Sequence, residues 1–198
     1  MMGSAGIRLF AAAACVVLSA SVSPAGVGPG EKAPAFVLKD VAGREHTLEQ
    51  SLGNRCVVVM FIATRCPVSN KYNERMSALY RDYAPKGVAF LAINSNKQED
   101  VEEVRRHAEE HGFRFPVLKD VDNRVADAYG AQVTPETYLI DPQGVIRYHG
   151  RIDDSMDPED VHTHDLRAAL DAVLGGTAVP RTETKAFGCS IKRVRGQS

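Results

Sequence analysis

The apolar residues of this chain gather in short continuous runs, and two of these runs predict buried strands. Residues 56–62 (CVVVMFI) and 88–93 (VAFLAI) are almost wholly apolar, a pattern typical of strands covered on both faces. Between them, apolar residues recur at steps of three and four and predict an amphipathic helix that Pro85 ends: Val68, Tyr72, Met76, Leu79 and Tyr83. This strand–helix–strand unit predicts two parallel strands joined by a right-handed crossover.

Shorter extended segments lie on both sides of this unit. Residues 36–38 and 46–48 predict a hairpin near the N-terminus. Residues 137–140 and 145–152 predict two antiparallel neighbours, because the Asp141-Pro142-Gln143-Gly144 loop between them has the residues of a type I turn.

Three further helices are predicted, at residues 101–111, at residues 125–129, and after Asp157, with Pro158 in the first helical position. Strands and helices thus alternate along most of the chain. We therefore expect an α/β fold in which a central mixed β-sheet is flanked by helices on both faces, with an N-terminal β-hairpin.

The first 25 residues have the pattern of a secretory signal peptide. Arg8 supplies a positive charge, residues 7–18 are apolar, and small residues precede a cleavage site after Ala25. The apolar run is too short for a helix that spans a membrane. We expect an exported protein, periplasmic or extracellular, with no stable membrane insertion once residues 1–25 are removed.

The rest of the chain divides into one domain and a tail. Residues 26–176 hold the predicted strands and helices and are enough for one hydrophobic core. Residues 177–198 form a basic C-terminal tail that carries Cys189. The formal net charge of the whole chain is −1, so its charge balance does not favour a nucleic-acid partner.

Cys66 stands at the predicted turn between the strand at 56–62 and the helix that follows, just before Pro67. A thiol at a helix N-terminus faces unpaired N–H groups and the positive end of the helix dipole, and both favour the thiolate. Arg65 adds a neighbouring cation. Because such a turn is rarely deeply buried, we expect Cys66 to be an accessible nucleophile rather than an inert core cysteine.

Three cysteines remain after residues 1–25, namely Cys56, Cys66 and Cys189, and an odd number leaves at least one thiol free or paired outside the chain. The strand between Cys56 and the turn spans about 20 Å, too far for a disulfide. Cys189 lies on a tail long enough to fold back. We hypothesise that it is the resolving partner of Cys66; a structural bridge or an inert exposed thiol are the alternatives.

The sequence indicates no metal and no organic cofactor. His107 and His111 lie one helical turn apart, but charged residues surround them, as on a solvated helix face. A copper-binding function would need a second cysteine near Cys66, and only the tail supplies one.

The segment FIATRCPVS at residues 61–69 and the dipeptide Thr134-Pro135 resemble the two halves of a thioredoxin-fold active site. In their order and spacing, seven longer segments resemble the peroxiredoxin-like redoxins of the alkyl hydroperoxide reductase/thiol antioxidant (AhpC/TSA) family: EKAPAF, CPVSNKYNERM, VAFLAINSN, FPVLKD, TPETYLIDPQG, YHGRIDD and GCSIK.

The resemblance implies a thioredoxin-like fold in which the Thr134–Pro135 bond is cis and faces Cys66. It also implies that the backbone of Thr134 pairs with the backbone of a bound substrate. We expect Pro135, Thr64 and Arg65 to contribute to the same substrate-binding surface. Glu136 is a candidate proton acceptor beside it.

Two departures from the family patterns bear on activity. The Cys-x-x-Cys motif of thioredoxins reads Cys66-Pro67-Val68-Ser69 here, so no disulfide forms within the motif. Val59 and Ala63 stand where the peroxiredoxin motif has Pro and Thr. We therefore predict a thiol oxidoreductase that exchanges with protein or small-molecule thiols and disulfides. A thiol peroxidase acting on peroxides and a non-catalytic redox-fold module that handles copper remain the alternatives.

Overall fold

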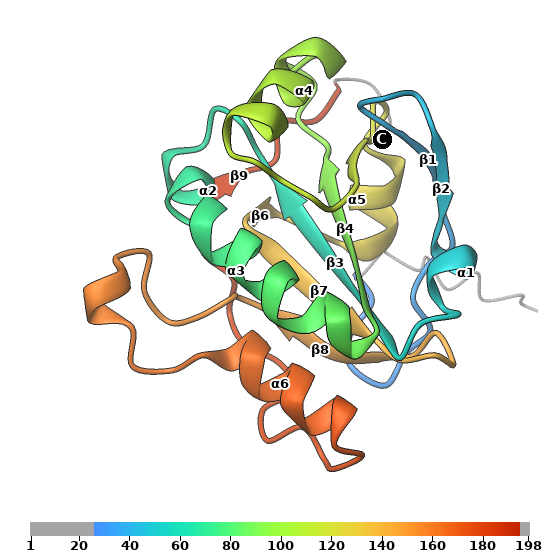
Figure 1. The fold of residues 1–198 in the computed structure, drawn as a ribbon. Helices are drawn as coiled ribbons and strands as arrows, with labels where there is room; N and C mark the ends of the chain where they lie inside the picture. The colour runs from blue at the N-terminus through green and yellow to red at the C-terminus, as the bar shows by residue number, and fades with distance from the viewer. Residues whose placement is uncertain (1–25, 195–198) are drawn as a thin grey trace, which may run out of the picture.

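The computed structural model describes residues 26–194, which form a seven-stranded mixed sheet with helices on both faces (Figure 1). The strand order across the sheet is β2-β1-β5-β4-β3-β7-β8, and β6 and β9 form a separate pair. The strands are β1 (Val37–Asp40), β2 (Glu45–Thr47), β3 (Cys56–Ile62), β4 (Val88–Asn94), β5 (Val117–Lys119), β6 (Val133–Thr134), β7 (Glu136–Ile140), β8 (Ile146–Gly150) and β9 (Cys189–Ser190). The α-helices are α1 (Leu48–Ser51), α2 (Pro67–Lys71), α3 (Asn73–Tyr83), α4 (Val101–Glu110), α5 (Arg124–Tyr129) and α6 (Asp165–Leu174).

Strand β3 lies inside the sheet and carries the predicted parallel crossover. It pairs with β4 in parallel from Cys56↔Val88 to Ile62↔Asn94, and with β7 in antiparallel orientation on its other side. All residues of β3 are buried, which explains its continuous apolar sequence. Because β3 and β4 run in the same direction, the loops that follow them lie at the same edge of the sheet.

The side chains of β3 alternate between two hydrophobic cores. Val58 and Met60 pack with the residues of α3, α4 and α6 on one face. Val57, Val59 and Phe61 pack on the other face with the residues of α5 and of the N-terminal hairpin. The prediction of a mixed sheet covered on both faces is therefore confirmed.

Both predicted antiparallel pairs are present. In the N-terminal hairpin, Val37 of β1 pairs with Thr47 of β2. Strands β7 and β8 pair across the turn at residues 141–144, where the carboxylate of Asp141 accepts the main-chain N–H groups of Gln143 and Val145, both at 2.9 Å. The turn residues predicted from the sequence therefore close this hairpin.

Two helices differ from their predicted extent. The helix after Cys66 is interrupted at Tyr72, whose N–H bonds to Ser69 in a tight turn and whose hydroxyl donates to Asp153 at 2.8 Å. The last helix begins at Asp165 rather than after Asp157, where residues 158–160 form only a short 3₁₀ turn. The carboxylate of Asp154 accepts the N–H groups of residues 162 and 163 and so holds the intervening segment outside a helix.

The C-terminal segment folds back over the domain (Figure 1), where the red end of the chain passes beside α2 and β6. His149 on β8 exchanges main-chain hydrogen bonds with Thr182 and Thr184 at 2.9 and 3.0 Å. Further along, β9 pairs with β6. The predicted tail is therefore bound first to the outer strand β8 and then to β6, which lies near the end of β3.

The expected signal peptide, residues 1–25, lies outside the described residues, and so does the end of the basic tail from residue 195. Across residues 26–194, each helix is too short or too polar to cross a bilayer.

Candidate active site

Cys66 is the N-cap of α2, at the sheet edge where β3 ends. Its backbone is extended, with φ −88° and ψ 113°, and its sulfur accepts the main-chain N–H of Ser69 at 3.3 Å. Pro67 takes the first helical position, where a missing N–H leaves no bond unmade. The sulfur therefore faces the positive end of α2, which favours negative charge on it.

The loop between β6 and β7 approaches Cys66 from the opposite side. The Thr134–Pro135 peptide bond in this loop is cis. The Cys66 thiol donates to the carbonyl oxygen of Thr134 at 3.4 Å. Thr134 and Pro135 therefore lie against the turn that holds the cysteine.

Strand β9 completes the arrangement by pairing with β6 in antiparallel register, Thr134↔Cys189 and Val133↔Ser190. Gly188 passes so close to Thr134 that a Cβ at this position would collide with the Thr134 carbonyl. The Cys189 thiol lies next to the Cys66 sulfur, close enough for each thiol to shift the pKa of the other. Both cysteines are free thiols. The two thiols and the cis-proline loop therefore meet at one place.

The surroundings of Cys66 favour its thiolate. Burial raises the pKa of this thiol, but hydrogen bonds from the Cys189 side chain and the Ser69 N–H outweigh that effect and leave the pKa below its ordinary value. For Cys189, burial and the neighbouring Cys66 sulfur raise the pKa. When the pair loses its first proton, the negative charge therefore resides mainly on Cys66.

The expectation that Cys66 is accessible to solvent is wrong. Cys66 is only 3% exposed, whereas Cys189 is partly exposed. The neighbouring turn residues Arg65 and Pro67 are exposed, as expected for a turn between a strand and a helix. The start of α2, the cis-proline loop and β9 all lie against the sulfur, and the last of these comes from the far end of the chain, which no local pattern around Cys66 predicts.

Thr64 and Arg65, expected to bind substrate, turn their side chains toward α4. The Thr64 hydroxyl donates to Glu103 at 2.6 Å, and the Arg65 guanidinium forms a two-pronged ion pair with the same carboxylate at 2.8 and 2.5 Å. The charge of Arg65 is therefore paired with Glu103. A role of either residue in substrate binding stays a prediction.

Glu99 is a functional candidate that the sequence analysis missed. Its buried carboxylate accepts the main-chain N–H groups of Thr64 at 2.8 Å and of Arg65 at 3.1 Å, and it also accepts the amides of Asn94 and Asn96. Burial raises the pKa of Glu99, but these hydrogen bonds outweigh it and hold the pKa below its usual value. The ionised carboxylate therefore holds the turn before Cys66. One sequence signal was available. Glu99 lies in the loop after β4, and this loop leaves the sheet beside the end of the parallel strand β3, where Cys66 lies.

The same polar cluster also holds the tail. The Lys192 N–H donates to the side-chain oxygen of Asn96 at 2.7 Å, and the Lys97 N–H donates to the Lys192 carbonyl at 2.9 Å. Beyond it, the Val194 N–H donates to the side chain of Asn123 at 2.8 Å. The residues just before Cys66 and the residue Lys192, which follows Cys189, are therefore anchored to the loop after β4.

Glu136, considered above as a proton acceptor, supports the cis-proline loop. Its buried carboxylate accepts the N–H groups of Gln132 at 2.8 Å and Val133 at 3.1 Å, and contacts His149 at 2.7 Å. Burial raises the pKa of Glu136, but His149 and the two N–H groups hold it below its usual value. An ionised carboxylate with these partners positions the loop that carries Thr134.

Cys56 lies at the other end of β3 and is fully buried. Burial raises the pKa of its thiol to about 11. Cys56 is therefore a core residue, and its thiol is protonated at neutral pH.

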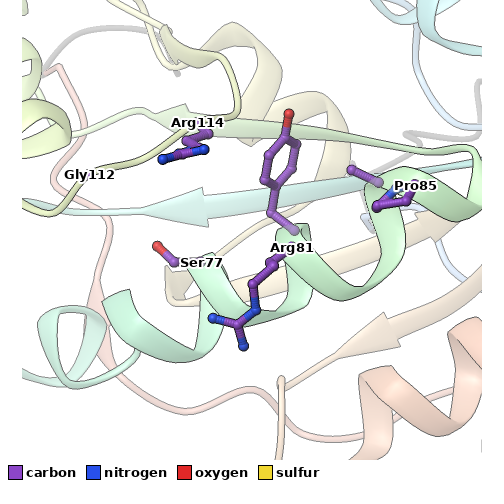
Figure 2. A pocket seen from close by; sticks show the side chains of 7 residues that line it. Ser77, Arg81, Pro85, Gly112 and Arg114 are labelled. Carbon is purple, nitrogen blue, oxygen red and sulfur yellow. The ribbon is translucent and has the colours of Figure 1, made fainter.

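Residues 26–194 contain no cluster of three or more His, Cys, Asp or Glu side chains arranged to hold a metal ion. A separate pocket of about 470 Å³ lies between α3 and residues 112–114, and Ser77, Arg81, Pro85, Gly112 and Arg114 contribute to its lining (Figure 2). Neither Cys66 nor Cys189 lines this pocket, so it is distinct from the thiol pair.

Comparison with known proteins identifies the family. The sequence profile of the AhpC/TSA family matches residues 29–149. The chain belongs to the AhpC/TSA family. A relative in this redoxin group is the thiol-disulfide oxidoreductase ResA of Geobacillus thermodenitrificans, 36% identical over 138 residues, which are 70% of this chain and 76% of ResA.

Solved structures place this AhpC/TSA-family protein among thioredoxin-like folds. A hypothetical protein of Sinorhizobium meliloti matches 86% of this chain and 97% of its own, with 38% identity and a TM-score of 0.80. The thioredoxin domain of a thiol-disulfide oxidoreductase of Bacteroides vulgatus matches 61% of this chain and 86% of its own, with 23% identity and a TM-score of 0.55. This second likeness bears on the fold alone, and the predicted thioredoxin-like fold is confirmed.

Proposed function

We propose that this protein is a thiol–disulfide oxidoreductase whose redox centre is the pair Cys66 and Cys189. The observation that carries the proposal is the β6–β9 pairing, which sets Cys189 opposite Thr134 and beside the Cys66 sulfur. The relation to ResA, a thiol-disulfide oxidoreductase by name, supports the same chemistry.

The pair exchanges two electrons with a disulfide substrate. One cysteine thiolate attacks the substrate and forms a mixed disulfide with one substrate sulfur, while the other leaves as a thiolate. The second cysteine then attacks the protein sulfur of the mixed disulfide, closes the Cys66–Cys189 bond and releases the remaining substrate thiol. The substrate disulfide is reduced and the protein is oxidised. Thr134 and Pro135 form the wall of the site, and the substrates are protein or small-molecule disulfides and thiols.

Peptide mapping and a turnover assay test the proposal. The reduced protein is treated with oxidised glutathione, and its disulfides are mapped without reductant; we expect a Cys66–Cys189 bond. The reduction of insulin by dithiothreitol is then followed with catalytic amounts of protein. We expect the acceleration to disappear in Cys66→Ser and Cys189→Ser and to persist in the matched control Cys56→Ala. A Cys56–Cys189 bond, or full activity in Cys66→Ser, contradicts the proposal.

Cu(I) binding is a second candidate, because two neighbouring thiols suit a soft cation. It predicts stoichiometric Cu(I) binding that either single Ser variant abolishes, without disulfide turnover. Peroxide reduction by the same thiol is a further candidate, but Ala63 and Val59 replace the peroxiredoxin Thr and Pro. A rate of oxidation by hydrogen peroxide similar to that of a free thiol contradicts it.

We also propose that the protein acts after export, in the periplasm or outside the cell. The pattern of residues 1–25, which is that of a secretory signal peptide, supports this location. The proposed chemistry also fits it, since disulfides form and persist in an oxidising compartment. Cell fractionation followed by N-terminal sequencing tests it. A mature protein that begins after Ala25 is expected; an uncleaved protein in the cytoplasm contradicts export.

A further inference from the structure

The two sulfurs of the proposed pair differ in their access to solvent. Cys66 is 3% exposed, and its sulfur is in contact with the Ser69 N–H, the Thr134 carbonyl and the Cys189 thiol. Cys189 is partly exposed and lies on the strand that covers Cys66. A molecule that approaches from solvent therefore meets Cys189 before it meets Cys66.

Strand β9 is held at both ends, so this cover is part of the fold. After Cys189, the Ile191 N–H donates to Gln132 at 2.9 Å and Lys192 bonds to Asn96 and Lys97. Before it, the ring of Phe187 packs edge-on against Tyr72 with 6.3 Å between their centroids. In the oxidised protein, a Cys66–Cys189 bond would tether the strand covalently as well.

Thiol–disulfide exchange depends on which sulfur the incoming thiolate reaches and which sulfur leaves. The incoming thiolate must approach along the S–S axis, from the side opposite the leaving sulfur. Cys66 is buried and Cys189 is partly exposed, so the Cys189 sulfur is the one that a thiolate arriving from solvent reaches first. The lower pKa of Cys66 also makes it the better leaving group of the two.

We infer that Cys189 is the sulfur that exchanges with outside thiols, and that Cys66 is the internal partner. This inference rests on the proposed function and reverses the roles expected from the sequence, in which Cys66 meets the substrate and Cys189 resolves. It identifies the tail cysteine as the catalytic residue that contacts the substrate. It also predicts that small thiols, or cysteines on extended segments, reach the site in preference to cysteines recessed in folded proteins.

The reductive step balances with a low-molecular-weight thiol as reductant. Its thiolate attacks the Cys189 sulfur and forms a mixed disulfide there, while the Cys66–Cys189 bond breaks and Cys66 leaves with the electron pair as a thiolate. A second thiolate then attacks the sulfur of the bound reductant and releases the Cys189 thiolate, which takes a proton. The two reductant thiols are thereby oxidised to one disulfide, and the protein receives two electrons.

The test maps the first mixed disulfide on the oxidised protein. The oxidised chain is mixed with reduced glutathione, quenched in acid at successive early times, unfolded and blocked with N-ethylmaleimide. Trypsin separates the three cysteines into residues 56–65, 66–71 and 186–192, because Arg55, Arg65, Lys71, Lys185 and Lys192 precede the cuts. Mass spectrometry then gives the fraction of glutathione on each peptide, extrapolated to zero time.

We expect glutathione on residues 186–192 and maleimide on residues 66–71, in at least about a tenfold excess over the opposite arrangement, because one sulfur is covered. Glutathione mainly on residues 66–71, or evenly on both peptides, overturns the inference and leaves the proposed function intact. If the oxidised chain contains no Cys66–Cys189 bond at the outset, the proposed function itself fails. The same mapping on Cys56→Ala removes the third thiol as a source of scrambling.

Discussion

The carboxylate of Glu99 accepts the main-chain N–H of Thr64 at 2.8 Å, two residues before Cys66. It accepts the next N–H, that of Arg65, at 3.1 Å. The turn before Cys66 is thus bound to a single buried charge.

Glu99→Gln tests this support. We expect the variant to lose about 2–3 kcal/mol of unfolding free energy, because an amide replaces a buried carboxylate that accepts several hydrogen bonds. Urea unfolding at neutral pH measures the loss. Glu102→Gln, on the exposed face of α4, is the matched control and should unfold like the parent protein. Equal stability of the two variants contradicts the role given to Glu99.

The pH dependence of stability follows from the same carboxylate. Because the pKa of Glu99 is below its ordinary value of 4.5 in the folded protein, its ionised form stabilises the fold above about pH 4.5. This contribution is lost as the pH falls below 4.5 toward the folded-state pKa. Urea unfolding between pH 7 and pH 3 should therefore show a smaller acid loss in Glu99→Gln than in the parent. Identical pH profiles contradict the prediction.

Gly188→Ala should remove the cover from Cys66. Gly188 has φ +154°, and an added Cβ would collide with the Thr134 carbonyl, so β9 must move away. We expect faster alkylation of Cys66 by iodoacetamide in the reduced protein, and slower formation of the Cys66–Cys189 bond. Gly176→Ala is the control, since Gly176 also has a positive φ, of +67°, but has open space around it. Unchanged alkylation in Gly188→Ala means that β9 does not protect Cys66.

Ser69→Cys should convert the site to the thioredoxin pattern. Ser69 stands where the thioredoxin motif has its second cysteine, and its hydroxyl oxygen accepts the Ala63 N–H at 3.2 Å. A thiol introduced here lies three residues from Cys66 at the start of α2 and should compete with Cys189 for it. We expect disulfide mapping to find the bond within residues 66–71 and a free Cys189. Retention of the Cys66–Cys189 bond would show that this disulfide is favoured over one within the motif.

Asp153→Ala should destabilise the protein more than a nearby exposed substitution. Asp153 is buried and pairs with Arg75 at 2.7 Å while accepting the Tyr72 hydroxyl at 2.8 Å. Removing it leaves these partners without their charged acceptor, and we expect a loss of about 3 kcal/mol.

Asp157→Ala is the matched control, because the Lys71–Asp157 pair is half-exposed and should contribute less than about 1 kcal/mol. Chemical denaturation of both variants measures the difference. Similar losses in the two variants contradict a structural role for the Tyr72–Arg75–Asp153 contact.

Local sequence patterns predicted most of the elements that position the site. The apolar run of β3 and the order Cys66-Pro67 were enough to locate a thiol at the start of a helix, because both depend on neighbouring residues. Glu99 was missed because its partners are main-chain N–H groups of residues 64 and 65, and main-chain donors leave no mark in a sequence. Asp165 was not recognised as the start of α6, because Asp154 controls that boundary from outside the helix.

The sequence by itself determined the alternation of strands and helices, the family resemblance and the place of Cys66 at a strand-to-helix turn, since apolar periodicity and capping are local properties. Only the tertiary structure decided which surface the tail covers, because the β6–β9 pairing is made by backbone groups of residues far apart in the chain. In the resulting arrangement Cys66 is buried and Cys189 is partly exposed. The relative reactivity of the two thiols therefore depends on a long-range contact, which the residues around either cysteine do not predict.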